Sequence, residues 1–219
     1  MEGGIAAGDS GSRRGKVTYW ASRLTLAALV LASTGLHALP ANATDAARAM
    51  LESMEATRPD WLPSLDKCPA DIMPARETEF SYSEKRCEST LEACVRNCGT
   101  GDAIDCYGSA VILQKVRPNP VSEALFLRAC ALGIVSGCTN RAAAMDSGDG
   151  VPCAIQTFTA ACDRRDPWAC TMIGLHLIRG IGIDKDHSRA RQLLSRSCPF
   201  GEADEACRSA KALMKEIRD

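Results

Sequence analysis

Apolar and small side chains return at helical spacing along the second half of the chain. The pattern is easiest to follow from the cysteines at 98, 130, 162 and 198. Four residues before these stand, in order, Cys94, Phe126, Phe158 and Leu194. Eight residues before them stand Thr90, Ser122, Ala154 and Ala190. Large apolar and small side chains one turn apart are typical of the buried face of a helix, so a helix is predicted before each cysteine.

A second series of helical positions follows the cysteines at 106, 138, 170 and 207. Four residues after the first three stand Ala110, Ala142 and Gly174, with Lys211 in the fourth copy. Seven residues after them stand Leu113, Met145, Leu177 and Met214. The spacing predicts a second helix after each of these cysteines, with small residues where two helices approach closely.

The cysteines therefore mark four copies of a two-helix unit. The frames read CGTGDAIDC, CALGIVSGC, CDRRDPWAC and CPFGEADEAC, and their first cysteines are 32, 32 and 36 residues apart. Turn-forming stretches separate the units, at 114–120, 146–152 and 179–186. One helix pair cannot bury its apolar face alone, but stacked pairs can. We therefore expect an all-α fold of two-helix repeats stacked as a short solenoid.

The first 43 residues have the layout of a secretory signal peptide. Four basic residues precede the apolar stretch LTLAALVLASTGLHAL, and ANA at 41–43 provides a small-residue cleavage site. The stretch is interrupted by polar residues, so we expect cleavage and no stable membrane span afterwards. All twelve cysteines lie beyond it and would reach an oxidising compartment, which predicts a periplasmic or secreted protein.

Because the cysteines are expected in an oxidising compartment, their repeated spacing predicts a disulfide framework. We expect one bridge across each interhelical turn, joining Cys98 to Cys106, Cys130 to Cys138, Cys162 to Cys170 and Cys198 to Cys207. Closing such a short loop contributes about 2–3 kcal/mol in the chain-entropy model.

Residues 44–82 are predicted to be a separate leading segment before the repeat domain of residues 83–219. A short amphipathic helix is expected over 46–56, with Ala46, Met50, Leu51 and Met54 on one face. Residues 57–82 carry four prolines and predict an extended connection. A helix is expected to resume near Ser83.

Four cysteines lie outside the frames. Cys87 and Cys94 are seven apart, about 10 Å along an unbroken helix, which is too far for a bridge. Cys87 is therefore the preferred partner of Cys68, with Cys94 as the alternative. Cys94 is otherwise interpreted as a buried apolar filler. Cys153 begins a helix and is expected to be a free or reactive thiol, or to join a second chain.

Charge and motifs point away from several kinds of chemistry. Lys and Arg number 26 and Asp and Glu 27, so no basic field for nucleic acid is expected. His176 and His187, beyond the signal peptide, are not at zinc-ligand spacing, and His176 is expected in solvent. We predict no metal, no cofactor and no catalytic residue. Ser64 and Lys67 match the serine–lysine motif of β-lactamases, without its companion motifs.

The repeat resembles a known family. The paired cysteines, the turn GIGIDKD at 180–186 and the run from Ala190 to Cys198 are similar to the cysteine-rich Sel-one-like repeat proteins, over residues 87–219. These are secreted bacterial relatives of the tetratricopeptide solenoids. The resemblance implies a right-handed solenoid whose surface binds a protein or peptide.

The resemblance leaves three functions open. The preferred one is a non-catalytic interaction or scaffold module with a partner in the cell envelope. Because some members are labelled penicillin-binding proteins or weak β-lactamases, the alternative is a β-lactam-binding or hydrolysing protein. The third is a purely structural envelope component.

Overall fold

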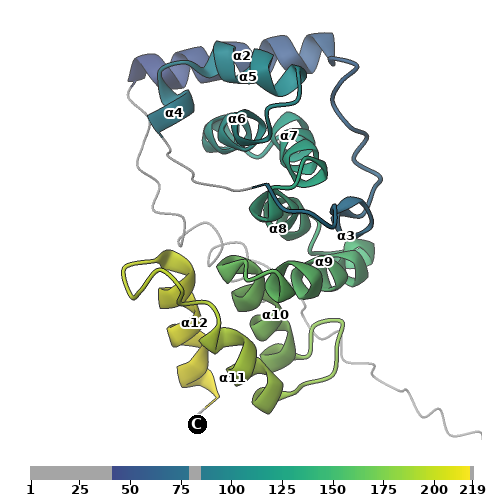
Figure 1. Ribbon diagram of the computed structural model, residues 1–219, viewed down its shortest axis with the longest axis vertical. Helices are drawn as coiled ribbons and strands as arrows, with labels where there is room; N and C mark the ends of the chain where they lie inside the picture. Colours follow the sequence, from purple (N-terminus) through teal and green to yellow (C-terminus); the bar gives the residue numbers. More distant parts are fainter. Residues whose placement is uncertain (1–40, 79–84, 218–219) are drawn as a thin grey trace, which may run out of the picture. The chain divides into compact units, whose positions relative to one another are not determined.

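The structure is a computed structural model that describes residues 41–78 and 85–217 (Figure 1). These residues form helices joined by turns, with no strand among them, so the predicted all-α class is confirmed. Residues 1–40, which make up most of the predicted signal peptide, lie outside the described residues.

The repeated sequence pattern corresponds to four consecutive helix pairs. In each pair the first helix ends close to the first cysteine of its frame, and the second begins shortly before the second cysteine. The pairs are α5 (Leu91–Gly99) with α6 (Ala103–Val116), α7 (Pro120–Ala131) with α8 (Val135–Ala144), α9 (Val151–Asp163) with α10 (Pro167–Arg179), and α11 (His187–Ser195) with α12 (Glu205–Glu216). The 3₁₀ turn η1 (Gly148–Gly150) precedes α9.

Each pair carries the disulfide that its frame predicted. The Cα atoms are 4.5 Å apart for Cys98–Cys106, 4.6 Å for Cys130–Cys138, 4.6 Å for Cys162–Cys170 and 4.5 Å for Cys198–Cys207. Seven of these eight cysteines are fully or almost fully buried, with Cys198 half-buried. Each bridge thus fixes the tight turn between two antiparallel helices within its own pair.

The residues inside the frames explain how so short a turn can start a new helix. Asp102, Asp166 and Asp204 are N-caps whose carboxylates accept main-chain N–H groups in the first turn of the second helix. Asp166 also accepts from the hydroxyls of Ser136, at 2.7 Å, and Thr139, at 3.1 Å, both on α8. This buried cap therefore ties its own pair to the preceding one.

Consecutive helices pack against one another through the array, and α10 also contacts α8 and α12. Every residue from Ala169 to Ile178 is buried, as expected for a helix with neighbours on all sides. A Cβ atom on Gly174 would lie 2.6 Å from a methyl carbon of Leu194, so this glycine permits close approach of α10 and α11, as predicted. The handedness of a solenoid stays a prediction.

The leading segment differs from its prediction in two places. The first helix, α2 (Ala41–Thr57), is longer than expected, and it buries Ala47, Leu51 and Met54. Ala46 is exposed and Met50 only half-buried, because the contacting face is turned by one residue. The predicted connection contains the one-turn helix α3 (Pro69–Ile72).

The helix expected from Ser83 is interrupted. It consists of α4 (Lys85–Glu88) and α5, which are separated by Ser89 and Thr90, whereas Ser83 itself lies outside the described residues. The hydroxyl of Thr90 donates to the carbonyl of Arg86 at 2.8 Å and so closes the end of α4. This break brings the Cα atoms of Cys87 and Cys94 to 5.9 Å, and the two are joined by a disulfide.

The predicted Cys68–Cys87 bridge is therefore wrong, as are its Cys68–Cys94 alternative and the interpretation of Cys94 as a filler. Cys68 is joined instead to Cys153, 85 residues away, with 5.8 Å between their Cα atoms. Cys153 is consequently neither a free nor a reactive thiol. All twelve cysteines lie among the described residues, and none of them is free.

Candidate functional site

Residues 58–78, here called the strap, leave the end of α2 and cross three helices of the array. Figure 1 shows this dark blue segment running from α2 to α3, and α3 contacts α7, α8 and α9. Apart from α3 the strap has no regular structure, and Pro69 is its one buried residue. Because it contributes so little to the core, its contacts with the helices resemble those of a bound peptide.

The strap begins with an aromatic anchor. The Trp61 ring lies against the end of α5, where a Cβ atom added to Gly99 would be 3.2 Å from it. The Arg128 guanidinium, from α7, lies 5.3 Å from the centre of the ring. The same guanidinium donates to the main-chain oxygens of Trp61 at 2.8 Å, Cys98 at 3.0 Å and Gly99 at 3.1 Å. One arginine thus joins the strap to the end of the first helix pair.

Two further arginines also bind the main chain of the strap. Arg141 on α8 donates from Nη2 to the carbonyl of Leu65 at 2.9 Å. Arg164, which follows the last residue of α9, donates from Nη1 to the carbonyl of Pro74. Because all three arginines contact carbonyl oxygens, which every residue carries, this part of the recognition is independent of side-chain sequence. We call the surface formed by Arg128, Arg141, Thr157 and Arg164 the strap face.

The middle and end of the strap are fixed by different contacts. The main-chain N–H of Ala70 donates to the hydroxyl of Thr157 on α9 at 3.2 Å, beside the Cys68–Cys153 disulfide. Near the end, the N–H of Thr78 donates to the carbonyl of Gly133 at 3.1 Å. Gly133 has a φ of 99°, and a Cβ there would lie 2.7 Å from the Thr78 hydroxyl, so glycine is required at this contact.

A buried ion pair lies beneath the strap. Arg141 Nη1 is 3.6 Å from Glu123 Oε2, and their side chains are 10% and 15% exposed. Burial raises the pKa of the Glu123 carboxyl to about 7, and the charge of Arg141 opposes this shift only in part. Neither Glu123 Oε2 nor Arg141 Nε has a hydrogen-bond partner among the described residues. Arg141 is thus only partly satisfied by its own helices and by the strap.

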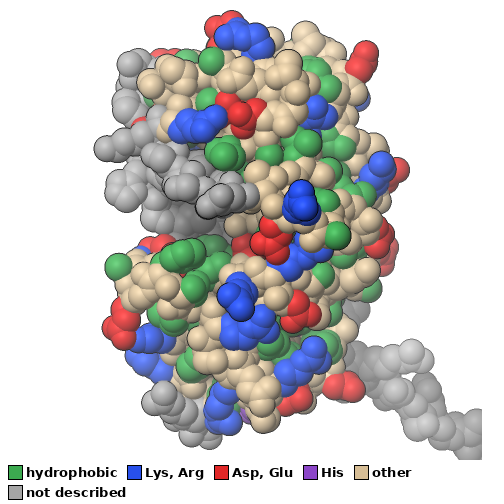
Figure 2. Space-filling view, in the orientation of Figure 1, with side chains coloured by type: hydrophobic (Ala, Val, Ile, Leu, Met, Phe, Trp, Pro, Cys, Tyr) green, Lys and Arg blue, Asp and Glu red, His purple; other side chains and the backbone are tan. Residues whose placement is uncertain are grey.

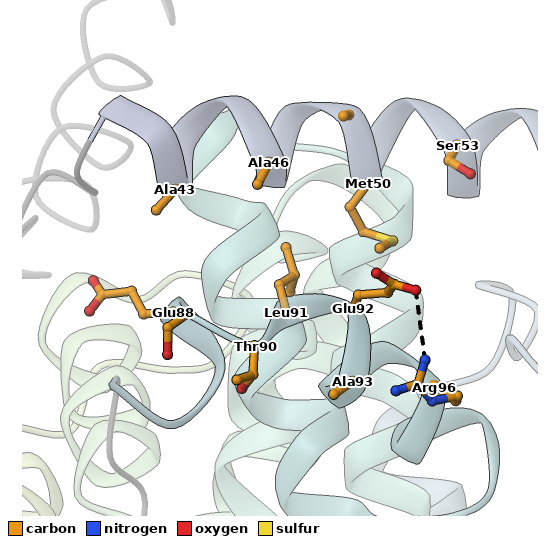
Figure 3. A pocket seen from close by; sticks show the side chains of 12 residues that line it. Ala43, Ala46, Met50, Ser53, Glu88, Thr90, Leu91, Glu92, Ala93 and Arg96 are labelled. Carbon is orange, nitrogen blue, oxygen red and sulfur yellow. Dashed lines mark ion pairs between the residues drawn. The ribbon is translucent and has the colours of Figure 1, made fainter.

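A second candidate is an open groove of about 590 Å³ between α2 and the α4–α5 segment. In Figure 3, Ala43, Ala46, Met50 and Ser53 on α2 lie opposite the labelled residues of α4 and α5. The groove offers small apolar side chains and the exposed Glu92–Arg96 ion pair, 3.7 Å long. It lacks a buried polar group that would orient a ligand, so we prefer the strap face.

His176 does not lie in solvent, contrary to its prediction, but is fully buried on α10. Its Nδ1 is 2.8 Å from the Ile181 carbonyl and its Nε2 is 2.9 Å from the Asp146 carboxylate. Burial lowers the pKa of His176, but the hydrogen bond and charge of Asp146 and the Ile181 carbonyl outweigh burial and raise it. With Ile181 and Asp146 at its two ring nitrogens, the histidine links two interhelical turns.

One cluster has the composition of a metal site. The sulfur atoms of Cys87 and Cys94 and a carboxylate oxygen of Asp105 lie within 4.8 Å of one another. The sulfurs form a disulfide and so cannot act as thiolates, and the Asp105 carboxylate accepts from Arg86 at 2.6 Å and Asn97 at 2.8 Å. The donor set therefore does not suit a metal ion.

The serine–lysine pair lies in the strap. Ser64 and Lys67 are both exposed and stand in irregular chain, not in the first turn of a helix. The arrangement gives Ser64 no enclosed surroundings in which a β-lactam would be positioned.

Charged side chains of both signs are interspersed over the face drawn in Figure 2. No helix within the described ranges has the length and apolar character to cross a membrane. Comparison of the chain with family models, with curated proteins and with solved structures gives no match.

Proposed function

We propose that this chain is an exported, non-catalytic protein-interaction module of stacked two-helix repeats, related to the cysteine-rich Sel-one-like proteins. The helix pairs and their four turn disulfides support the resemblance. Six disulfides without a free cysteine are typical of the oxidising compartments outside the cytoplasm, which supports export to the periplasm or medium.

The contact between the strap and the helices supports an interaction role most directly. Arginines of α7 and α8 and at the end of α9 each donate to a main-chain carbonyl of an irregular segment. Helical repeat arrays commonly use such extended surfaces to bind peptides. The partner we propose is accordingly a protein or peptide of the cell envelope.

Site-specific photocrosslinking in the exporting cell tests this function. A photoreactive amino acid would replace Gln114 on α6, Ala131 on α7 or Gln192 on α11, which are all exposed. We expect a discrete protein adduct from the position or positions that contact the partner, and no adduct from a position that faces away from it. Failure of all three positions to give an adduct would contradict the interaction role. Nitrocefin hydrolysis that is abolished by Ser64→Ala would favour the β-lactamase alternative.

A further inference from the structure

We propose that the strap face is a docking site for an extended, aromatic-bearing peptide, masked by the chain's own strap and opened when a dithiol reduces the Cys68–Cys153 disulfide. The proposal deepens the function above and rests on it. It assigns the interaction to one surface, gives the chemistry of the partner and names the event that exposes the surface.

The strap is held as a ligand rather than as part of the core. Most of its hydrogen bonds to the helices use its own main-chain groups, and the Asp71 carboxylate adds one from the side chain of Gln156 at 3.4 Å. Trp61 and Leu62 pack against the core at its start. Most of its side chains are exposed or half-buried. Since Pro69 is the one buried residue of the strap, we expect its departure to leave the packing of α7, α8 and α9 against their neighbours intact.

The disulfide that fixes the strap is the most accessible of the six. Cys68 and Cys153 are both half-buried, whereas every other bridge contains at least one fully or almost fully buried cysteine. It also differs in range, because it spans 85 residues and the others span seven to nine. Its reduction therefore changes the position of one segment without opening any helix pair.

The exchange follows ordinary dithiol chemistry. One thiolate of a dithiol reductant attacks Sγ of Cys68, and the Cys68–Cys153 bond breaks as a mixed disulfide forms. Cys153 leaves as a thiolate in the first turn of α9, where the positive end of the helix stabilises the charge, and then takes up a proton. The second thiol of the reductant then displaces Cys68. Two electrons pass to the protein, and the reductant becomes a disulfide.

The exposed face sets the chemistry of its partner. Release of the strap leaves N–H donors of Arg128, Arg141 and Arg164 without the carbonyls that they bind in the closed form. It also removes the Trp61 ring from its place beside Gly99 and Arg128. A peptide in extended conformation supplies successive carbonyls to these donors, and an aromatic side chain replaces Trp61. In a known mode of peptide recognition, main-chain hydrogen bonds supply the affinity and side-chain pockets supply the selectivity.

Hydrogen exchange on the oxidised full chain tests the release. The test variant is Cys68→Ser/Cys153→Ser, and the matched control is Cys87→Ser/Cys94→Ser, which removes another bridge outside the frames. We expect amide exchange in residues 58–78 to rise at least about tenfold in the test variant alone, with α7 to α10 still protected. Treatment of the native protein with dithiothreitol, just sufficient to reduce one bridge, should have the same effect. A strap that stays protected, or loss of protection throughout α7 to α10, would overturn the proposal.

Binding of a fluorescent strap peptide, residues 58–78 with Cys68→Ser, tests the docking site itself. Because a tethered strap competes at an effective concentration in the millimolar range, the receiving protein also carries Trp61→Ala to weaken its own strap. We expect this triple variant to bind the peptide at least about tenfold more tightly than the native protein does, and Arg141→Ala with Arg164→Ala to reverse the gain. Equal binding by native protein and triple variant would refute masking, and no binding to the triple variant would refute the docking site. Since the probe comes from the chain itself, both outcomes are independent of whether an envelope partner is found.

Discussion

Arg196 donates from Nη2 to the main-chain oxygen of Cys162 at 2.6 Å. Arg128 makes the equivalent contact earlier in the array, where its Nε lies 3.0 Å from the oxygen of Cys98. Each arginine stands two residues before the first cysteine of its own frame and reaches the first cysteine of the preceding frame. Each of these oxygens also accepts a main-chain N–H of the following turn, from Arg165 at 2.9 Å and Gly101 at 3.0 Å. The arginine is therefore a second donor, and its contact joins consecutive pairs.

The first prediction concerns this link between pairs. We expect Arg196→Ala to lower the free energy of unfolding by about 1 kcal/mol, because the carbonyl of Cys162 loses a charged donor at a partly exposed site. Urea denaturation of the oxidised protein measures the change. Arg189→Ala is the matched control, as its exposed side chain lies on the same helix, and it should cost less than about 0.5 kcal/mol. Equal losses in the two variants would contradict the link.

The second prediction is a loss of stability as the pH rises. The pKa of Glu123 is about 7 in the fold, above its ordinary value of 4.5, so the folded state holds a proton that the unfolded state releases. The contribution of this group, on the order of 3 kcal/mol, is therefore fully present below pH 4.5 and is lost as the pH rises from 4.5 through about 7. Glu123→Gln should flatten this part of the stability curve, measured by denaturation between pH 4.5 and 8. A variant curve parallel to that of the native protein would exclude Glu123 as the source.

The third prediction concerns the buried pair of His176 and Asp146. Because the pKa of His176 is raised in the fold, its contribution is fully present below its ordinary value of 6.5 and is lost as the pH rises through the folded value. We expect Asp146→Asn to destabilise the protein more at pH 6 than at pH 9. An NMR titration should show the His176 ring titrating at lower pH in this variant. His187→Gln, at an exposed position, should leave both measurements unchanged.

The fourth prediction concerns the close approach of α7 and α8. A Cβ atom on Gly137 would lie 2.8 Å from the main-chain oxygen of Phe126 and 3.0 Å from the main-chain nitrogen of Cys130. Gly137→Ala gains about 1 kcal/mol in helix propensity, but the clash is with backbone that the Cys130–Cys138 bridge holds in place. We therefore expect a net loss of about 1–3 kcal/mol in thermal or urea unfolding. Net stabilisation would show that the two helices can move apart.

The helix pairs and their bridges could be predicted because each depends on residues close in sequence. A period of 32 residues with fixed cysteine spacing specifies helix, turn and helix without reference to distant contacts. The strap could not be predicted in this way. It is held mainly through its own main-chain carbonyls, which leave no pattern in its side chains, and its bridge from Cys68 to Cys153 crosses 85 residues.

The sequence does contain signals for the Cys87–Cys94 bridge and for the burial of His176, although the predictions missed both. Ser89 and Thr90 precede Leu91 and Glu92, as at the start of a helix, and this break permits the Cys87–Cys94 bridge. The run from Ala169 to Ile178 is apolar on nearly all sides, and a helix of that kind is buried all round. A histidine within it should therefore be expected to need polar partners inside the protein, as His176 does.

The long range of the Cys68–Cys153 bridge has a consequence for biogenesis. In a chain exported from its N-terminus, Cys68 arrives in the oxidising compartment before six cysteines that separate it from its partner. An oxidase that joins cysteines in order of arrival would pair Cys68 with Cys87 and would mispair the cysteines of the first two frames, whereas the last two frames would pair as they do in the structure. For the exported protein proposed above, oxidation in order of arrival would have to be followed by thiol–disulfide shuffling, and we expect a cell without a disulfide isomerase to accumulate mispaired chains.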